Sequence, residues 1–180
     1  MINDLLQLIQ TRRSVFPAQY TQGEISSSDL HKILESARWA PNHRKTEPWR
    51  YKVLQGEALT SLGDFMEEQF MASTGKPTSY KIKKLKTNLE ASSAVCLIFM
   101  HRDEQEAVPE WEEVAATAMS VQNMWLTCHA LGHGCYWSSP KSYADMSQYD
   151  RISVDDRERF LGFFFLGTFD EAPDHQLPAR

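Results

Sequence analysis

The chain has 180 residues, of which 42% are apolar and 24% are charged, and its formal net charge is −5. This length and composition predict one domain over residues 1–180 with a sizeable core, and they exclude a disordered or membrane-spanning chain. The acidic balance argues against nucleic acid as a partner, because a nucleic-acid-binding domain carries a basic face.

Helical spacing and proline positions predict the first elements. Apolar residues recur with a helical period over residues 2–13, so a helix is expected there, before Pro17. Residues 26–41 predict a second helix with a serine cap and a proline stop. A strand is then expected over residues 47–56, and a third helix over residues 57–73.

The second half of the chain mixes strands with helices. Residues 74–88 are polar and basic, and they predict a loop that leads into a short helix with a solvated lysine face. The continuous apolar run 94–100 predicts a strand that is buried on both sides. The longest helix is expected over 109–134, and further strands over 135–139 and 161–169. Helices and strands without strict alternation indicate an α+β fold.

The longest predicted helix is apolar over more than one face. Its apolar residues include Val114, Ala115, Ala118, Met119, Val121, Met124, Trp125, Leu126 and Leu131. Such a helix is buried in a large core or against a partner, and in a chain of this length we expect a partner.

The compartment is predicted from what the sequence lacks. No apolar run approaches the length of a membrane span, and the first residues lack the basic-then-apolar order of a secretion signal. Cys96, Cys128 and Cys135 form neither a disulfide framework nor a zinc-binding pattern. Reduced thiols of this kind fit a cytoplasm best, so we expect a cytoplasmic protein with no membrane partner.

Arg12, Arg13 and Ser14 directly follow the first predicted helix, and they have two interpretations. Cations at a helix C-terminus satisfy its last carbonyl groups and its dipole, which stabilises the helix by about 0.3–1 kcal/mol for each cation. Arginine forks and a serine hydroxyl are also the donors that bind a phosphate. The spacing by itself favours the cap and leaves the anion site open.

Two further stretches place polar groups beside buried elements. The loop between Pro41 and Pro48 links a helix to a strand and contains Asn42 and His43; functional groups often gather on such loops. The strand 135–139 ends in two serines. That ending predicts either a turn or a strand end that presents N–H groups and hydroxyls to a ligand.

Common catalytic and metal motifs are not found. The sequence contains no dinucleotide fingerprint, phosphate loop, nucleophile elbow or zinc-protease motif. His129 and His133 are four residues apart, but Gly132 and Gly134 put His133 at or past the end of the helix. We therefore expect no metal site, and no nucleophilic role for Cys128.

Taken together and in this order, four stretches resemble the nitroreductase-like flavoprotein family, in its compact, short-chain subset. They are TRRSVF, ARWAPNHRKTEPWRYKVLQG, GHGCYWSSP and FLGFFFLGTF, and the similarity runs over about the whole chain. The resemblance implies a central, mostly antiparallel sheet flanked by helices. It also implies an intertwined homodimer with two flavins at the subunit interface, which agrees with the broad apolar surface of the longest helix.

The resemblance also implies a set of cofactor-binding residues. Arg12, Arg13 and Ser14 would hold the phosphate of FMN. Trp39 and His43 would lie near the cofactor, from the neighbouring subunit, with Asn42 as a further candidate. The remaining members of the set would lie beside the ribityl chain or the flavin ring: Trp137, Ser138 and Ser139.

The implied activity is that of an NAD(P)H-dependent oxidoreductase. A nicotinamide would pass a hydride to flavin N5 and leave, and a nitroaromatic, quinone or similar electron-poor acceptor would take its place. No side chain is expected to act as acid, base or nucleophile. A cation or N–H donor should face N1 and O2 of the reduced flavin, and Arg44, Lys45 or one of Lys81 to Lys86 is expected there.

Two other functions stay open at this point. One is a flavin-binding or regulatory protein with little turnover, because the resembling motifs describe the flavin site and not a substrate. The other is a cofactor-free interaction module that uses the longest helix as a docking surface.

Overall fold

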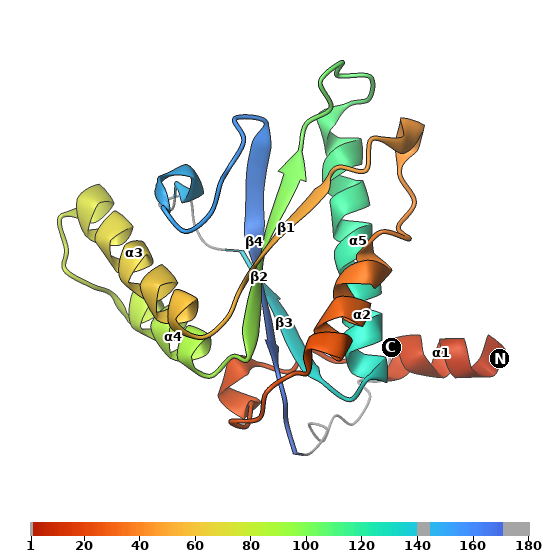
Figure 1. Ribbon diagram of the computed structural model, residues 1–180, viewed down its shortest axis with the longest axis horizontal. Coiled ribbons are helices and arrows are strands. Elements are labelled where there is room, and N and C mark those ends of the chain that lie inside the picture. The colour runs from red at the N-terminus through yellow and green to blue at the C-terminus, as the bar shows by residue number, and fades with distance from the viewer. Residues whose placement is uncertain (1, 140–144, 171–180) are drawn as a thin grey trace.

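The structure is a computed structural model that describes residues 2–139 and 145–170. Within these residues the centre is a four-stranded sheet with the order β1-β2-β4-β3, in which every neighbouring pair is antiparallel (Figure 1). Its strands are β1 (Trp49–Leu54), β2 (Ala94–His101), β3 (Gly134–Ser138) and β4 (Glu158–Gly167). The predicted α+β fold with an antiparallel sheet is confirmed.

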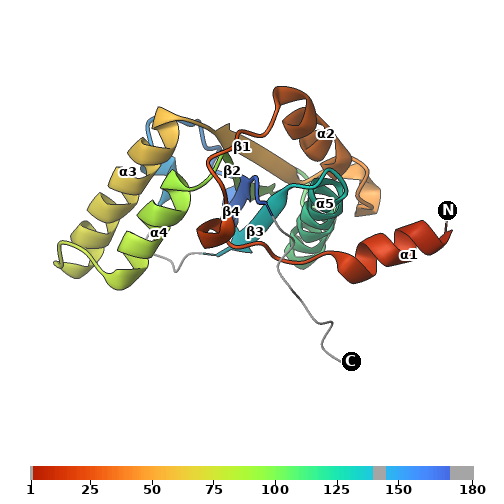
Figure 2. The same cartoon turned by 90° about the horizontal axis from the view of Figure 1, so that it is seen from below.

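Four helices cover the two faces of this sheet in the described part of the chain: α2 (Ser27–Ala37), α3 (Glu57–Thr74), α4 (Tyr80–Glu90) and α5 (Glu110–Ala130). A further helix, α1 (Ile2–Thr11), precedes them. In Figures 1 and 2, α3 and α4 pack on one face, and α2 and α5 pack on the other. None of the helices in the described part of the chain is long and apolar enough to cross a bilayer.

Strand β2 joins the two halves of the core. Its residues alternate between the two faces of the sheet, as the period of a strand requires. Cys96 and Ile98 pack with α2 and α5, whereas Val95, Leu97 and Phe99 pack with α3 and α4. These residues are fully buried, which confirms the predicted strand with two apolar faces.

Helix α1 ends at Thr11, two residues earlier than expected, and projects away from the body (Figure 2). The backbone N–H of Arg12 still bonds to the Leu8 carbonyl at 3.0 Å. The chain then becomes extended, because the Val15 N–H donates to the Cys135 carbonyl at 3.1 Å and so ties the segment to β3. None of the α1 residues is buried. The first apolar residue of this helix, Ile2, is 74% exposed.

The apolar character of α5 is only partly used within one chain. Of its predicted apolar residues, Val121 and Met124 are buried, whereas Met119 is 41% exposed. The buried face instead includes the polar residues Glu113, Thr117 and Ser120. Each polar group has a partner: Glu113 accepts from Arg102, and the two hydroxyls donate to carbonyls of the preceding turn. Helical hydroxyls that donate to these carbonyls can be buried, and part of the apolar surface of α5, such as Met119, stays exposed.

Candidate functional site

The predicted phosphate-binding residues lie where α1 meets the start of β3. Arg13 Nη1 donates to the carbonyls of Gln10 and Arg12, at 2.7 and 2.8 Å. This is the C-terminal capping role that the spacing favoured. Ser14 is half-buried in the extended segment that follows. The structure therefore assigns the cap to Arg13 and frees Arg12 from it.

Arg12 is held differently from its neighbour. Its guanidinium carbon lies 4.8 Å from the centre of the Trp125 ring on α5, within the range of a cation–π contact. Its Nη1 is buried and has no hydrogen-bond partner. Burial lowers the pKa of Arg12, and no carboxylate among the described residues pairs with it. An arginine remains protonated in proteins, so a buried donor here lacks an acceptor that an anion can supply.

The end of β3 is fixed by one carbonyl of β4. Trp137 Nε1 and Ser139 Oγ both donate to the Leu161 carbonyl, at 3.4 and 3.2 Å. The neighbouring Gly162 has a φ of +140°, and the register of β2 against β4 shifts at this point. A β-bulge of this kind re-aims the partner strand. The three predicted residues, Trp137, Ser138 and Ser139, are thereby held together.

A cavity of about 710 Å³ opens beside Ser138 and Ser139. Its wall comes from four parts of the chain: the segment after Arg13, helix α4, strand β3 and strand β4. The lining residues are Phe16, Pro17, Ala18, Gln19, Lys81, Lys84, Leu85, Asn88, Tyr136, Ser138, Ser139 and Phe163. Among the residues that the structure describes, two lysines and no carboxylate line it, although the whole chain is acidic.

The sequence predicted that the lysines of α4 form a solvated face, and the structure shows that two of them also line the cavity. Lys81, Lys84 and Asn88 recur at helical spacing and line the cavity together. Lys86 instead donates to Asp64 and Glu67 of α3, at 2.8 and 3.0 Å. The spacing of the lysines along the helix could have shown that Lys81 and Lys84 share one face and that Lys86 lies on another. Only the structure shows which of these faces meets the cavity.

The contacts of His43 place it apart from Arg12 of the same chain. His43 Nδ1 is 2.7 Å from Glu112 Oε2, at the start of α5, whereas Arg12 contacts Trp125 in the second half of that helix. Thirteen helical positions separate Glu112 from Trp125, a rise of about 20 Å. Asn42 Oδ1 accepts the Glu47 N–H at 3.1 Å, and Trp39 is 78% exposed.

The loop that carries Asn42 and His43 is conformationally unusual. Arg44, Lys45 and Glu47 all have positive φ values, of 54°, 55° and 42°. Side-chain-bearing residues seldom adopt this region, and such strain tends to collect at ligand sites and switches. The loop thus combines unusual backbone geometry with a tryptophan nearby, Trp39, that is largely exposed.

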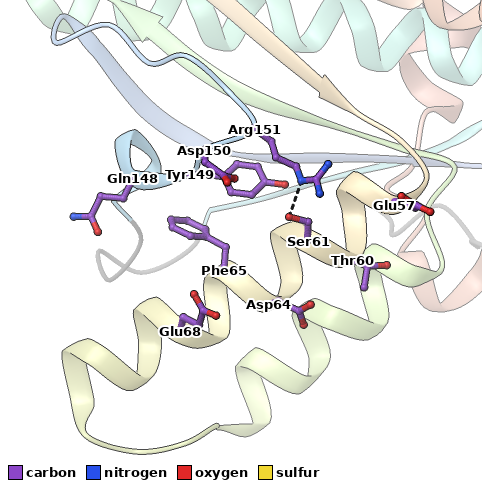
Figure 3. Close-up of a pocket in the computed structure, with 10 residues that line it drawn as sticks. All are labelled: Glu57, Thr60, Ser61, Asp64, Phe65, Glu68, Gln148, Tyr149, Asp150 and Arg151. Atoms are coloured by element: carbon purple, nitrogen blue, oxygen red, sulfur yellow. Dashed lines mark hydrogen bonds between the residues drawn. The ribbon is translucent and has the colours of Figure 1, made fainter.

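A second cavity, of about 690 Å³, lies between α3 and the short helix Met146–Gln148 (Figure 3). Its lining includes the carboxylates of Glu57, Asp64, Glu68 and Asp150, and Arg151 Nε donates to Ser61 Oγ at 3.0 Å. No predicted site residue lines it. Its negative charge suits neither a phosphate nor a reduced flavin.

The cysteines do not form a reactive centre. Cys96, Cys128 and Cys135 are reduced and buried. Burial raises the pKa of Cys96 to about 12 and also raises that of Cys135. Thiols of this kind are poor nucleophiles, because the thiolate is the reactive form. The described residues also contain no group of three or more side chains that could hold a metal ion.

Comparison with known proteins gives this arrangement a family. Residues 9–168 match the model of the nitroreductase family. The chain is 31% identical to YfhC of Bacillus subtilis, provisionally named an NAD(P)H nitroreductase, over 94% of this chain and 87% of YfhC. A nitroreductase-like family protein from Bacillus cereus is 26% identical, with a TM-score of 0.74, over 98% of this chain and 91% of that one.

A further solved structure shares the fold at lower identity. It is a provisionally assigned nitroreductase from Desulfovibrio desulfuricans, determined in complex with FMN. The identity is 20% and the TM-score 0.67, over 96% of this chain and 90% of that one. Because the family model covers most of the chain, the chain belongs to the nitroreductase family, a family of oxidoreductase enzymes.

Proposed function

We propose that this protein is an NAD(P)H-dependent oxidoreductase that binds FMN and reduces nitroaromatic, quinone or similar electron-poor acceptors. The observation that carries the proposal is Arg12 Nη1, a buried cationic donor without an acceptor, in the segment that also holds Ser14. Charge-assisted hydrogen bonds contribute about 1.5–3 kcal/mol each, so a phosphate here would be bound well. Family membership, and the FMN in the Desulfovibrio structure, support FMN as the molecule that brings this phosphate.

The cavity beside Ser138 and Ser139 is where we place the flavin ring. Phe16, Tyr136 and Phe163 supply apolar and aromatic walls, and the serines supply polar groups at the rim. A mostly apolar cavity with a few polar groups is typical of a cofactor site. Four residues that line the cavity, Phe16 to Gln19, come shortly after Arg12–Ser14 in the chain. One segment can therefore contact both the phosphate and the ring.

We assign the cation for the reduced flavin to Lys81 or Lys84. Both line the cavity, whereas Lys86 is already paired with Asp64 and Glu67. A cation near N1 and O2 stabilises the negative charge that develops there on reduction. This reduces the set that the sequence left open to two residues within one chain.

A second copy of the chain completes the site in this proposal. His43 contacts α5 about 20 Å along the helix from the Arg12 contact, so we assign His43, with its neighbours Trp39 and Asn42, to the flavin that the other chain holds by its Arg12. Helix α1 carries an apolar stripe that one chain leaves exposed: Ile2, Leu5, Leu6 and Ile9. Burial of such a stripe against another subunit would contribute about 25 cal/mol per Å². We therefore propose a homodimer with FMN at its interface.

The chemistry needs little from the side chains. When bound, FMN supplies the two-electron chemistry, in which a hydride from NAD(P)H is taken up and later passed to the acceptor in a ping-pong sequence. The residues of this chain bind and orient: Arg12 and Ser14 fix the phosphate, the Leu161 carbonyl fixes the end of β3, and Lys81 or Lys84 balances charge. The aromatic walls exclude water, and no side chain is required as acid, base or nucleophile.

Anaerobic mixing tests the proposal. The purified protein, loaded with FMN, is mixed with NADPH or NADH, and the flavin absorbance is followed in a stopped-flow instrument. Bleaching within seconds, followed by recovery of the yellow colour on addition of 4-nitrobenzoate or menadione, is the expected result.

The other outcomes identify the two alternatives. A flavin that stays oxidised for minutes with both nucleotides would favour a flavin-binding protein with little turnover. A colourless protein that takes up no FMN on reconstitution would favour an interaction module. Size-exclusion chromatography with light scattering on the same samples tests the dimer separately.

A further inference from the structure

Trp125 lies against the arginine of the proposed phosphate site. Helix α5 presents Trp125 and His129, one turn apart, to the end of α1, where His129 Nε2 is 3.1 Å from Thr11 Oγ1. The Arg12 guanidinium carbon is 4.8 Å from the centre of the Trp125 ring. The indole also packs edge-on against Phe164 of β4, with ring centres 5.6 Å apart. The sheet therefore fixes the indole, and the indole supports Arg12.

Two buried donors without acceptors occur together at this contact. Trp125 Nε1 is buried and has no hydrogen-bond partner, and the same holds for Arg12 Nη1. Unpartnered buried donors are rare in native proteins and indicate a missing acceptor, such as an ordered water or an ion. The guanidinium is cationic and no carboxylate of the described residues pairs with it, so the missing acceptor is expected to be an anion.

We propose that Trp125 is a cofactor-binding residue, whose ring face holds Arg12 in place and whose indole N–H donates, together with Arg12 Nη1, to the terminal phosphate of FMN. This inference rests on the proposed function of the site. An indole N–H can only donate, which suits an oxygen that carries charge and no proton. The ring contributes separately, because a cation over an indole face is attracted by it and loses part of its freedom to turn away.

The test compares FMN with riboflavin, which has the same ring and ribityl chain but no phosphate. The apoprotein is titrated with each flavin, and quenching of flavin fluorescence gives the two dissociation constants. Trp125→Phe keeps an aromatic face and removes the N–H, whereas Trp125→Leu removes both. Trp111→Phe is the matched control, since Trp111 lies on the same helix and is 69% exposed.

The proposal predicts a loss that depends on the phosphate. Trp125→Phe should weaken FMN about tenfold, as expected for one hydrogen bond to a charged group, and leave riboflavin unchanged. Trp125→Leu should weaken FMN further, because Arg12 also loses its support. Unchanged FMN affinity in Trp125→Phe, or an equal loss for both flavins, overturns the proposal. If the wild-type protein binds neither flavin, the proposed function fails first and this inference fails with it.

A second measurement follows the wild-type protein and uses a variant only to assign the signal. The indole N–H signal of Trp125, one of five tryptophans, is followed in a ¹H–¹⁵N spectrum of the wild-type protein and assigned by its loss in Trp125→Phe. It should move downfield when FMN is added, as a new hydrogen bond to an anion requires, and move much less with riboflavin. A signal that shifts equally with both flavins contradicts donation to the phosphate.

Discussion

Gly162 and Ser138 lie so close that a Cβ added to Gly162 would be 2.5 Å from the Ser138 carbonyl oxygen. The φ of Gly162 is also +140°, which residues with a side chain rarely adopt. Glycine at this position therefore allows β3 to end against β4 with Ser138 and Ser139 facing the cavity. The two residues lie on the neighbouring strands β3 and β4, and together they set the geometry of the proposed flavin site.

Gly162→Ala should displace the end of β3 and damage both stability and flavin binding. We expect a loss of about 1–3 kcal/mol in the free energy of unfolding, from overpacking and backbone strain, measured by urea denaturation. Gly132→Ala is the control, because Gly132 has a φ of +77° but an added Cβ would contact nothing within 4 Å. It should lose stability by strain alone and keep its FMN affinity. An FMN affinity that falls equally in both variants would contradict this role for Gly162.

Arg12→Ala and Arg13→Ala should affect different properties, the first FMN affinity and the second the stability of α1. Arg12 has the unpartnered buried donor, so its removal should weaken FMN by about 10- to 100-fold and change the melting temperature of the apoprotein little. Arg13 caps α1 through the Gln10 carbonyl, so its removal should mainly loosen α1. Isothermal titration with FMN and thermal melting of the apoprotein separate the two. The capping interpretation of Arg12 would be restored if both variants lost affinity and stability to the same extent.

Leu5→Glu and Ile9→Glu should prevent dimer formation. Both side chains belong to the apolar stripe of α1 and are exposed in one chain, by 53% and 47%. A charge placed in a buried interface is costly, whereas the folded monomer should tolerate it. Light scattering should therefore give a monomer mass with unchanged circular dichroism. Gln7→Glu, on the same helix but outside the stripe, should remain dimeric, and a monomeric Gln7→Glu would show that charge on α1 alone disrupts assembly.

Lys81→Gln and Lys84→Gln test which cation faces the reduced flavin. The residue that faces N1 and O2 should, when replaced, lower the flavin midpoint potential and slow reduction by NADPH, because reduced flavin loses its compensating charge. Lys83→Gln is the control, since Lys83 is exposed and does not line the cavity. Potentials measured by dye equilibration should fall in one of the first two variants and stay constant in the third. Constant potentials in all three would point to a cation from the other subunit.

His129 should report on the phosphate through its pKa. Burial lowers this pKa, and the positive charges of Arg12 and Arg13 lower it further. A lowered histidine pKa means that the unfolded state binds protons more readily, so the apoprotein should lose stability as the pH falls below about 6.5, the ordinary value. Bound phosphate offsets the arginine charges, and FMN should therefore raise the pKa of His129.

Titration of His129 followed by NMR, with and without FMN, measures this directly. His129→Gln keeps a hydrogen-bonding group near Thr11 and should remove this component of the pH dependence of apoprotein melting. His31 is the reference signal, since it is exposed on α2. A His129 pKa that does not respond to FMN would argue against a phosphate in this place.

Much of the fold was predictable because its signals are local. The run 94–100 could only be a strand with two buried faces, and the serine at position 26 does cap α2 by accepting the Asp29 N–H. The order of the Arg-Arg-Ser, Pro-Trp and closing-strand elements was enough for the family to be suspected. The end of α1 was misplaced by two residues, because the bond between Val15 and Cys135 that ends it joins positions distant in sequence.

The site was predictable only as a set of residue types. The sequence could not separate Arg12 from Arg13, since both are cations after a helix; the position of Trp125 on α5 does so. It could not choose between Lys84 and Lys86 either, because that choice depends on which face of α4 meets the cavity and which meets α3. Trp125 itself was assigned only to an apolar surface.

The sequence by itself determined the helices, the strands and the α+β class, since periodicity and caps act over a few residues and are written directly in the chain, and its resemblance to a known family indicated the kind of protein. Only the tertiary structure decided which donors are left without acceptors, which lysines line a cavity and which apolar stripe stays exposed. Those properties depend on burial, and burial arises from contacts between segments that are far apart in the sequence.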